Sequence, residues 1–428
     1  MWTKWLPGIM ALVLTMLPQG RALGQGLTGL FPEGVPGYGT APGVTVLSRA
    51  RTGRDTEARH AGAFLITPSL EQSFGYDDNV LSGANRRGSW MLGTRPSLLI
   101  ASGWSRDAFG AYFSAADTRY PGQPQQSRTD GTASVGGAID VGRDRLTISA
   151  AHLSQHENRS ELDALPADRP IAFQLDDARA SYAAVFGRWT LTPESEVSSR
   201  HYADTTILGV PAGQAYRDRL MLRGGTTLRY EWAPLRNLVF VARALTQRYT
   251  APVAGQPSLN STGYQALIGF DYDDDTVWRY RLLAGGETRQ FASAAYQPHS
   301  AFIAEGELTW NPTALTTLRA TLSRSIEDAA QEGVSGFTYT AGRLGIDHEI
   351  RRDWLISASA ELRHAAYSQR GGQQSGHAIG AGLTWLVNRS ARVSATYDLS
   401  GVRGAGPVSS AATGYSRDVA LLTLRLGL

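Results

Sequence analysis

The feature that most constrains this fold is the strict interleaving of short and long breaks between strand-like segments from residue 63 to residue 428. The short breaks lie at 102–106, 141–144, 186–189, 231–237, 273–276, 310–314, 350–354 and 386–390. The longer polar stretches lie at 77–88, 120–127, 160–170, 204–214, 251–260, 291–299, 328–335, 368–374 and 401–413. Eight short and nine long connections predict eighteen strands. Each strand and its connection then takes about 20 residues, close to what a tilted membrane-spanning strand requires.

The strand-like segments carry one apolar and one polar face. In RRDWLISASAELRH (351–364), apolar side chains occupy every second position: Trp354, Ile356, Ala358, Ala360 and Leu362. Side chains alternate across a pleated strand, so this pattern predicts two different environments. Soluble β-sandwiches also alternate, but their strands are about 5–6 residues long and their turns do not sort by length. We therefore predict an all-β fold, a transmembrane antiparallel up-and-down β-barrel of about 18 strands with short periplasmic turns and long outer loops.

Aromatic residues gather at both ends of the predicted strands. Tryptophans lie within a few residues of the short breaks: Trp104, Trp189, Trp232, Trp278, Trp310, Trp354 and Trp385. Tyrosines lie at the opposite ends: Tyr76, Tyr120, Tyr202, Tyr216, Tyr249, Tyr296, Tyr339, Tyr367 and Tyr415. This distribution predicts two interfacial girdles, one at each membrane surface. The last segment, DVALLTLRLGL, alternates up to the final residue, which is typical of the terminal strand that the barrel-insertion machinery recognises.

The N-terminal residues differ in composition from the rest of the chain. Residues 1–24 combine Lys4, an apolar run and small residues before a possible cleavage point, which predicts a signal peptide. Residues 25–62 are rich in Gly, Pro and then Arg, and we expect a flexible periplasmic leader there, followed by the barrel at 63–428. The chain has no cysteine, which excludes disulfides and a cysteine nucleophile. Its formal net charge of +3 gives no basic field for nucleic acid.

Several segments resemble a known family. They are GVTVLSRA at 43–50, FLITPSLEQSFGYDDNVLSG at 64–83, LTWNPTALTTLRATLSRSIED at 308–328 and GIDHEIRRDWLISASAELRH at 345–364. With the alternating pattern between them, the chain resembles the putative outer-membrane beta-barrel porin 2 family from about residue 43 to residue 428. The resemblance implies a barrel in the outer membrane of a Gram-negative bacterium, without a catalytic residue set or a cofactor.

From that resemblance we expect a pore for passive or guided passage of polar solutes. Members of the family often accompany exopolysaccharide export, so an exported polysaccharide is the expected cargo. The expected partners are outer-membrane lipid and lipopolysaccharide, the barrel-insertion machinery and periplasmic polysaccharide-export components. A non-conducting barrel that acts as an adhesin or receptor remains the alternative.

Alternation also selects candidate pore-lining residues. Those on inward positions are Arg217, Arg219, Arg223 and Arg229, then Arg279, Arg281, Glu287 and Arg289, with Glu305, Glu307, Arg319, Glu361 and Arg363 nearby in the wall. Guanidinium groups bind carboxylates and phosphates in bidentate fashion, so an arginine-lined channel favours anions or acidic sugars. Opposed Arg and Glu residues can instead simply brace the wall. The segment 160–173 is the longest interruption, and it can fold inward as a constriction.

Three patterns suggest other chemistry. His152 and Ser154 share the lipid-facing side of one strand, an arrangement similar to part of outer-membrane phospholipase. A serine hydrolase also needs a group that orients the histidine, and Asn158 is too far along the strand to serve. DHEI at 347–350 lacks the second histidine of a zinc motif, and DYDDD at 271–275 is either a calcium site or a solvated acidic turn. We therefore expect no enzyme and no metal, with a lipid hydrolase as the weaker alternative.

Overall fold

The computed structural model describes residues 31, 34–38, 44–49, 51, 53–54, 56 and 58–428, apart from 254, 274–276, 369–370 and 406–413. The predicted signal peptide lies outside the described residues, as does much of the predicted leader. No helix in the described part of the chain is long and apolar enough to cross a membrane.

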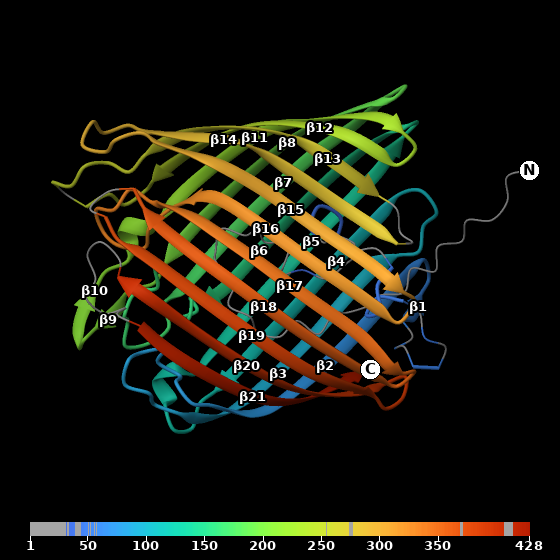
Figure 1. Cartoon of the computed structure of the whole chain (residues 1–428), viewed down its shortest axis with the longest axis horizontal. Coiled ribbons are helices and arrows are strands. Elements are labelled where there is room, and N and C mark those ends of the chain that lie inside the picture. The colour runs from blue at the N-terminus through green and yellow to red at the C-terminus, as the bar shows by residue number, and fades with distance from the viewer. Residues whose placement is uncertain are drawn as a thin grey trace, which may run out of the picture.

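The eighteen predicted strands are present and form one closed antiparallel barrel (Figure 1). They are β2 (Phe64–Asp77), β3 (Ser89–Ser102), β4 (Ala108–Arg119), β5 (Arg128–Val141), β6 (Asp144–His156), β7 (Ala172–Phe186), β8 (Trp189–Tyr202), β11 (Arg219–Ala233), β12 (Arg236–Tyr249), β13 (Ser261–Asp273), β14 (Trp278–Phe291), β15 (His299–Thr313), β16 (Thr316–Glu327), β17 (Phe337–Arg351), β18 (Trp354–Tyr367), β19 (Gln373–Leu386), β20 (Ala391–Ala405) and β21 (Gly414–Gly427). Each strand pairs with the next, and β21 closes the barrel by pairing with β2 as well as β20.

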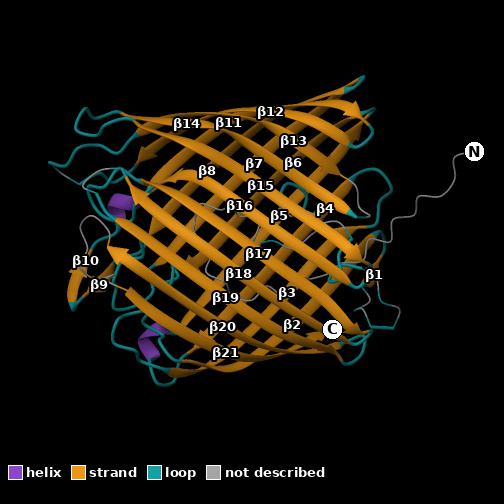
Figure 2. Cartoon of the chain, viewed as in Figure 1, coloured by secondary structure: helices purple, strands orange, loops and turns teal. Residues whose placement is uncertain are grey.

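Little regular structure lies outside the barrel wall (Figure 2). A short strand, β1 (Arg59–Ala61), pairs with the start of β2, and a small hairpin joins β9 (Thr205–Ile207) to β10 (Val210–Ala212). Two single 3₁₀ turns, η2 (Pro124–Gln126) and η3 (Ala215–Arg217), lie in the long loops. The loops fall on one end of the barrel, and the short turns fall on the other, where the chain also ends (Figure 1).

Two of the tightest turns contain glycine in the left-handed conformation. Two residues join β5 to β6 and β7 to β8, and their first residues, Gly142 and Gly187, have φ angles of 68° and 62°. This left-handed conformation costs glycine little and most other residues more, and two-residue hairpins favour it. The sequences VGRD and FGRW therefore specify their turns locally.

The outer wall is apolar and ends in the predicted tryptophan girdle. Leu362 of the opening pattern is 71% exposed in the isolated chain, so its face meets lipid. Near the short turns Trp278 stacks on Trp310 with ring centroids 4.8 Å apart, and Trp354 stacks on Trp385 at 5.8 Å. The apolar positions of β21 also face outward, as predicted.

The predicted tyrosine girdle at the other end is wrong for most of its members. Tyr76 is 43% exposed beside Trp90 on the outer wall, as expected. The tyrosines that are buried instead are Tyr120, Tyr202, Tyr296, Tyr339 and Tyr367. Tyr120 and Tyr296 lie in outer loops, whereas Tyr202, Tyr339 and Tyr367 lie in strands but face inward, because one residue of register moves a side chain to the other face. These inward tyrosines pack against loops that fold into the barrel.

Described residues of the predicted leader also lie inside the barrel. Phe31, Val35 and Tyr38 are at most 2% exposed and pack against inward side chains of β3 to β8. Val46 is buried with Leu355 and Leu386. These residues are therefore held against the wall, unlike the flexible periplasmic arm expected from their composition. The division of the chain into signal, leader and barrel stays a prediction.

Candidate functional site

The loop at 157–171, between β6 and β7, constricts the outer mouth of the barrel. Its residue Glu161 accepts a hydrogen bond from Arg363 on β18, with 2.7 Å between Oε2 and Nη1. Tyr415 on β21 donates its hydroxyl to the carbonyl of Ser160 at 2.8 Å. Because β18 lies across the barrel from β6 and β7, the loop spans the lumen. The predicted inward fold of this segment is confirmed.

Asp163 holds the tip of this loop, which we call the constriction loop. Its carboxylate accepts hydrogen bonds from the hydroxyl of Tyr367 at 2.6 Å, from the side chain of Gln331 at 3.1 Å and from the backbone of Ala330. Its backbone N–H donates to Gln374 at 2.7 Å. Asp163 also has a φ of 63°, a conformation that Asp tolerates better than bulky residues. The constriction loop is thus latched to β18, to β19 and to the neighbouring loop at 328–336.

Burial changes the acidity of both carboxyl groups. Desolvation raises the pKa of Glu161 to about 7, against the opposing effect of Arg363. Desolvation likewise raises the pKa of Asp163 to about 6, although the Tyr367 hydroxyl lowers it. The docked loop therefore binds protons more tightly than a loop released into water.

A second buried contact joins the constriction loop to the next outer loop. Arg217 donates to Glu157 at 3.1 Å, and its guanidinium lies 4.0 Å from the ring centroid of Tyr202. Arg217 was predicted on the inward face of a strand, but it belongs to the 3₁₀ turn η3, just before β11 begins. The turn ends the inward alternation, so Arg217 fastens a loop instead of lining a strand.

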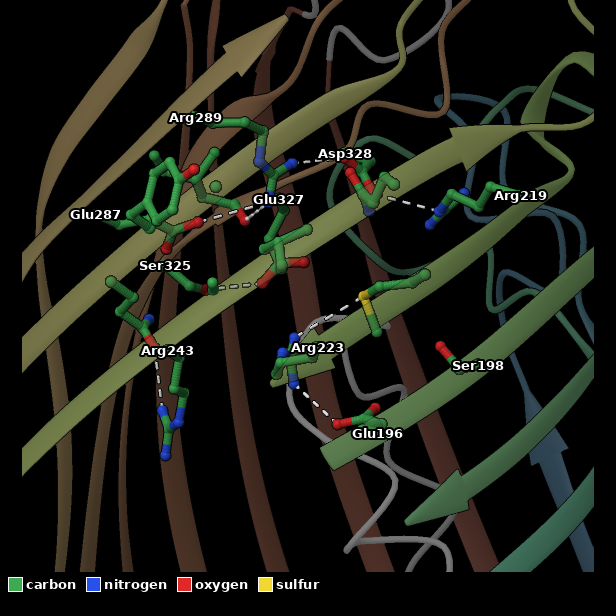
Figure 3. Close-up of a pocket in the computed structure, with 18 of the residues that line it drawn as sticks. Glu196, Ser198, Arg219, Arg223, Arg243, Glu287, Arg289, Ser325, Glu327 and Asp328 are labelled. Carbon is green, nitrogen blue, oxygen red and sulfur yellow. Dashed lines mark hydrogen bonds and ion pairs between the residues drawn. The ribbon is translucent and has the colours of Figure 1, made fainter. Parts of the chain in front are cut away.

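Beneath the loops the wall of β7 to β16 presents paired charges around a cavity of about 290 Å³ (Figure 3). Asp328 accepts from Arg289 at 2.6 Å and lies 3.3 Å from Arg219. Arg223 pairs with Glu196 at 3.1 Å. These groups lie on β8, β11 and β14 and in the loop after β16, and they point toward one another (Figure 3).

The remaining predicted pore-lining residues share the inward face. The register of neighbouring strands places them there: Arg219, Arg223, Arg229, Arg279, Arg281, Glu287, Arg289, Glu305, Glu307, Arg319, Glu361 and Arg363. Not all of them reach open space, because Glu287, Arg289 and Arg363 are 4–6% exposed beneath the inward loops. Their role in conduction stays a prediction.

Carboxylates on other strands pair with these arginines. Arg229 pairs with Asp271 at 3.0 Å, and Arg319 pairs with Asp347 at 2.5 Å. Arg243, which the sequence did not single out, lies between Glu194 at 3.0 Å and Glu305 at 2.7 Å. This pairing supports the bracing interpretation over an anion-selective surface. The partners were missed because pairing across strands depends on register, for which one strand gives no signal.

The histidine of the hydrolase-like pattern has an orienting carboxylate. His152 lies opposite Asp176 on the adjacent strand β7, with 2.7 Å between Nδ1 and Oδ1. Both side chains are more than half exposed on the outer wall, and Ser154 lies two residues along the same face. The sequence alone did not reveal Asp176, which is 24 residues from His152.

The acidic motifs have structural roles where they are described. Asp77 of YDDN pairs with Arg417 at 2.6 Å, and the amide of Asn79 donates to the carbonyls of Gly83 and Ser416. These contacts tie the first outer loop to β21. Asp271 of DYDDD faces inward, and Asp274 and Asp275 lie outside the described residues. Within the described part of the chain, no cluster of three or more His, Asp or Glu residues could hold a metal ion.

Several solved barrel structures are similar to this chain at low identity. The FrpB iron transporter from Neisseria meningitidis (F3-3 variant) is 10% identical with a TM-score of 0.44, over 79% of this chain and 62% of that chain. The chain thus spans less than two thirds of that transporter. The copper transporter OprC is 10% identical with a TM-score of 0.45, over 87% of this chain and 84% of that chain. The outer membrane protein opdK from Pseudomonas aeruginosa is 11% identical with a TM-score of 0.42, over 85% and 98%.

These structural likenesses are too weak to indicate a cargo. No curated protein sequence is significantly similar to this chain. The family described as putative beta-barrel porin 2 matches residues 55–426, which includes all eighteen long strands except the end of the last. The chain therefore belongs to the putative beta-barrel porin 2 family, with the porin-like fold of an outer-membrane barrel.

Proposed function

We propose that this protein provides a pathway for polar solutes across the outer membrane, with an exported polysaccharide as its cargo. The observation that carries the proposal is a lumen wall of paired charges beneath a latched constriction loop. Eighteen-stranded barrels are wide enough for an aqueous channel. Passage then consists of diffusion or guided movement along the wall, without a covalent step.

The pairing of charges suits a carbohydrate better than a strongly charged solute. Pairs such as Arg223 with Glu196 and Arg243 with Glu305 present donors and acceptors side by side without a large net field. Sugar hydroxyl groups can exchange hydrogen bonds with both members of such a pair. A strongly anionic polymer interacts less favourably with this wall, because carboxylates lie beside the arginines.

Single-channel recording in a planar bilayer tests the proposal. We expect discrete conductance steps, a reversal potential near zero in a KCl gradient, and block by neutral oligosaccharides that increases with their length. The R363Q/Y367F variant, which loses the hydrogen bonds from Arg363 to Glu161 and from Tyr367 to Asp163, should conduct more. If neither the folded parent nor this variant conducts at any voltage, the proposal is overturned. A strong anion preference would instead overturn the argument from paired charges.

The proposal includes location and partners. We place the protein in the outer membrane of a Gram-negative bacterium, with residues 1–24 as a cleaved signal peptide. Lipopolysaccharide and lipid then contact the outer wall, the barrel-insertion machinery acts on β21, and a periplasmic export component contacts the short turns. Mass spectrometry of the protein purified from outer membranes tests the signal: an N-terminus within a few residues of Gln25 is expected, and retention of Met1 would contradict it.

A lipid hydrolase is a second candidate function. The observation in its favour is the His152–Asp176 hydrogen bond on the outer wall, with Ser154 on the same face. Ser154→Ala should abolish ester hydrolysis by the barrel in phospholipid vesicles and leave conductance unchanged, if this site is catalytic. Ser195→Ala, which changes another outward serine on β8, is the matched control. Equal hydrolysis rates in parent and S154A would exclude the site.

The adhesin or receptor alternative rests on the hairpin of β9 and β10, which projects at the loop end (Figure 1). Its residues Leu208 and Val210 are 85% and 64% exposed. Exposed apolar side chains at a loop tip can contact a partner outside the cell. A folded barrel that stays silent in bilayers and still binds cells through this hairpin would favour the alternative.

A further inference from the structure

The described N-terminal residues lie in a groove made by two glycines of the lumen wall. Gly110 on β4 and Gly136 on β5 are register partners and face inward. A Cβ atom on Gly110 would overlap with the carbonyl of Gly34, and one on Gly136 would overlap with the carbonyl of Pro36. The backbone of residues 34–36 thus occupies the space that two side chains would otherwise fill.

Side chains fasten the same segment on both sides of the groove. Val35 and Tyr38 are each 1% exposed. The hydroxyl of Tyr38 donates to Asp177 on β7 at 2.7 Å, and the guanidinium of Arg179 lies 5.1 Å from the centroid of its ring. Gly37 lies directly over Ser149 of β6. The wall from β4 to β7 is therefore complementary to this segment in shape and in hydrogen bonding.

The chain is also anchored on the other side of the barrel. The backbone of Val46 donates to Thr317 of β16 at 2.9 Å, and Val46 packs between Leu355 of β18 and Leu386 of β19. Arg51 pairs with Glu349 of β17 at 3.1 Å. Because β4 to β7 and β16 to β19 are opposite walls, the N-terminal residues contact both sides of the lumen.

We propose that Phe31 and residues 34–38 are an intraluminal plug that seats on the Gly110–Gly136 groove and narrows the pathway, so that the plug must leave the groove for the pore to reach its full conductance. The barrel does not need the plug for its own hydrogen bonds, since every long strand is paired with its two neighbours. The described residues of the plug, Phe31 and 34–38, have no strand pairing with the wall, so the plug can leave while the barrel stays intact. This proposal rests on the proposed pore function and adds its closing element.

The absence of cysteine allows a specific test. Ser149→Cys places a single thiol on the wall beneath Gly37, where the parent side chain is 4% exposed. In this background Gly136→Ala adds a methyl group in the groove and should expel the plug. The matched control is Gly137→Ala, the next residue of β5, whose added Cβ faces outward and has its nearest atom 3.8 Å away. The measurements are the labelling rate with a water-soluble maleimide and the single-channel conductance.

We expect Gly136→Ala to speed labelling about tenfold or more, because the plug no longer covers the thiol, and to raise conductance. Gly137→Ala should change neither. If labelling is faster but the conductance is measurable and unchanged, the plug proposal is overturned and the pore proposal still stands. Faster labelling with no conductance in any variant would overturn the pore itself. If neither Gly136→Ala nor the double variant G110A/G136A speeds labelling, the plug does not occupy this groove and the proposal fails.

Discussion

Raising the pH should release the constriction loop. Its two buried carboxyl groups, Glu161 and Asp163, have pKa values of about 7 and about 6 in the docked loop, raised from 4.5 and 3.8 by desolvation. A group whose pKa is raised on docking stabilises the docked state fully below its free pKa, and that stabilisation is lost as the pH rises through the docked value. The loss therefore begins above about pH 4 and is complete slightly above pH 7.

The magnitude follows from the two shifts. Between pH 5 and pH 8, deprotonation of Glu161 weakens docking of the loop by about 3 kcal/mol, and deprotonation of Asp163 weakens it by about 1 kcal/mol. A difference of one pKa unit corresponds to about 1.4 kcal/mol. Arg363, which faces Glu161, keeps its charge and Tyr367, which faces Asp163, keeps its hydroxyl proton in this range, because guanidinium and phenol groups titrate well above pH 8. Docking should therefore weaken by about 4 kcal/mol in total.

Single-channel recordings at pH 5, 6, 7 and 8 measure this effect as the fraction of time spent in the high-conductance state. We expect that fraction to increase with pH in the parent. The variant E161Q/D163N keeps neutral side chains of similar size, so its open fraction should be low and independent of pH. An open fraction that decreases with rising pH, or an equal pH dependence in the variant, would refute the reasoning.

Two further changes test the latch and the outer wall. Tyr367→Phe removes the hydroxyl that donates to Asp163, which should weaken docking of the constriction loop by about 1–3 kcal/mol and raise the open fraction. The control Tyr76→Phe, on the outer wall, should leave the open fraction unchanged. Equal effects of the two substitutions would contradict the role of Tyr367 in holding the loop. Trp310→Ala removes the stack with Trp278, which should lower the free energy of unfolding in lipid vesicles by about 1–2 kcal/mol in urea titrations; an unchanged midpoint would argue against a stabilising girdle.

The sequence by itself was enough for the architecture. Turn lengths and period-two alternation predicted the strand number and the lipid face, because each depends on a few neighbouring residues. Gly142 and Gly187 specify their turns locally. The tryptophans near the short turns face lipid, since the turns next to them define both their depth and their facing.

How side chains and loops pair inside the barrel was decided by the tertiary structure, although alternation along the strands had already placed the charged wall residues inward. The tyrosines Tyr367 and Tyr415 face inward because loops fold over the lumen and accept their hydroxyl groups. Asp176 meets His152, and Asp328 meets Arg289, through contacts between segments far apart in the chain. Such contacts depend on register and on how loops fill the lumen, and a periodic pattern along one strand carries no information about either. The groove of Gly110 and Gly136 has the same origin, because only the folded barrel brings Gly34 and Pro36 against them.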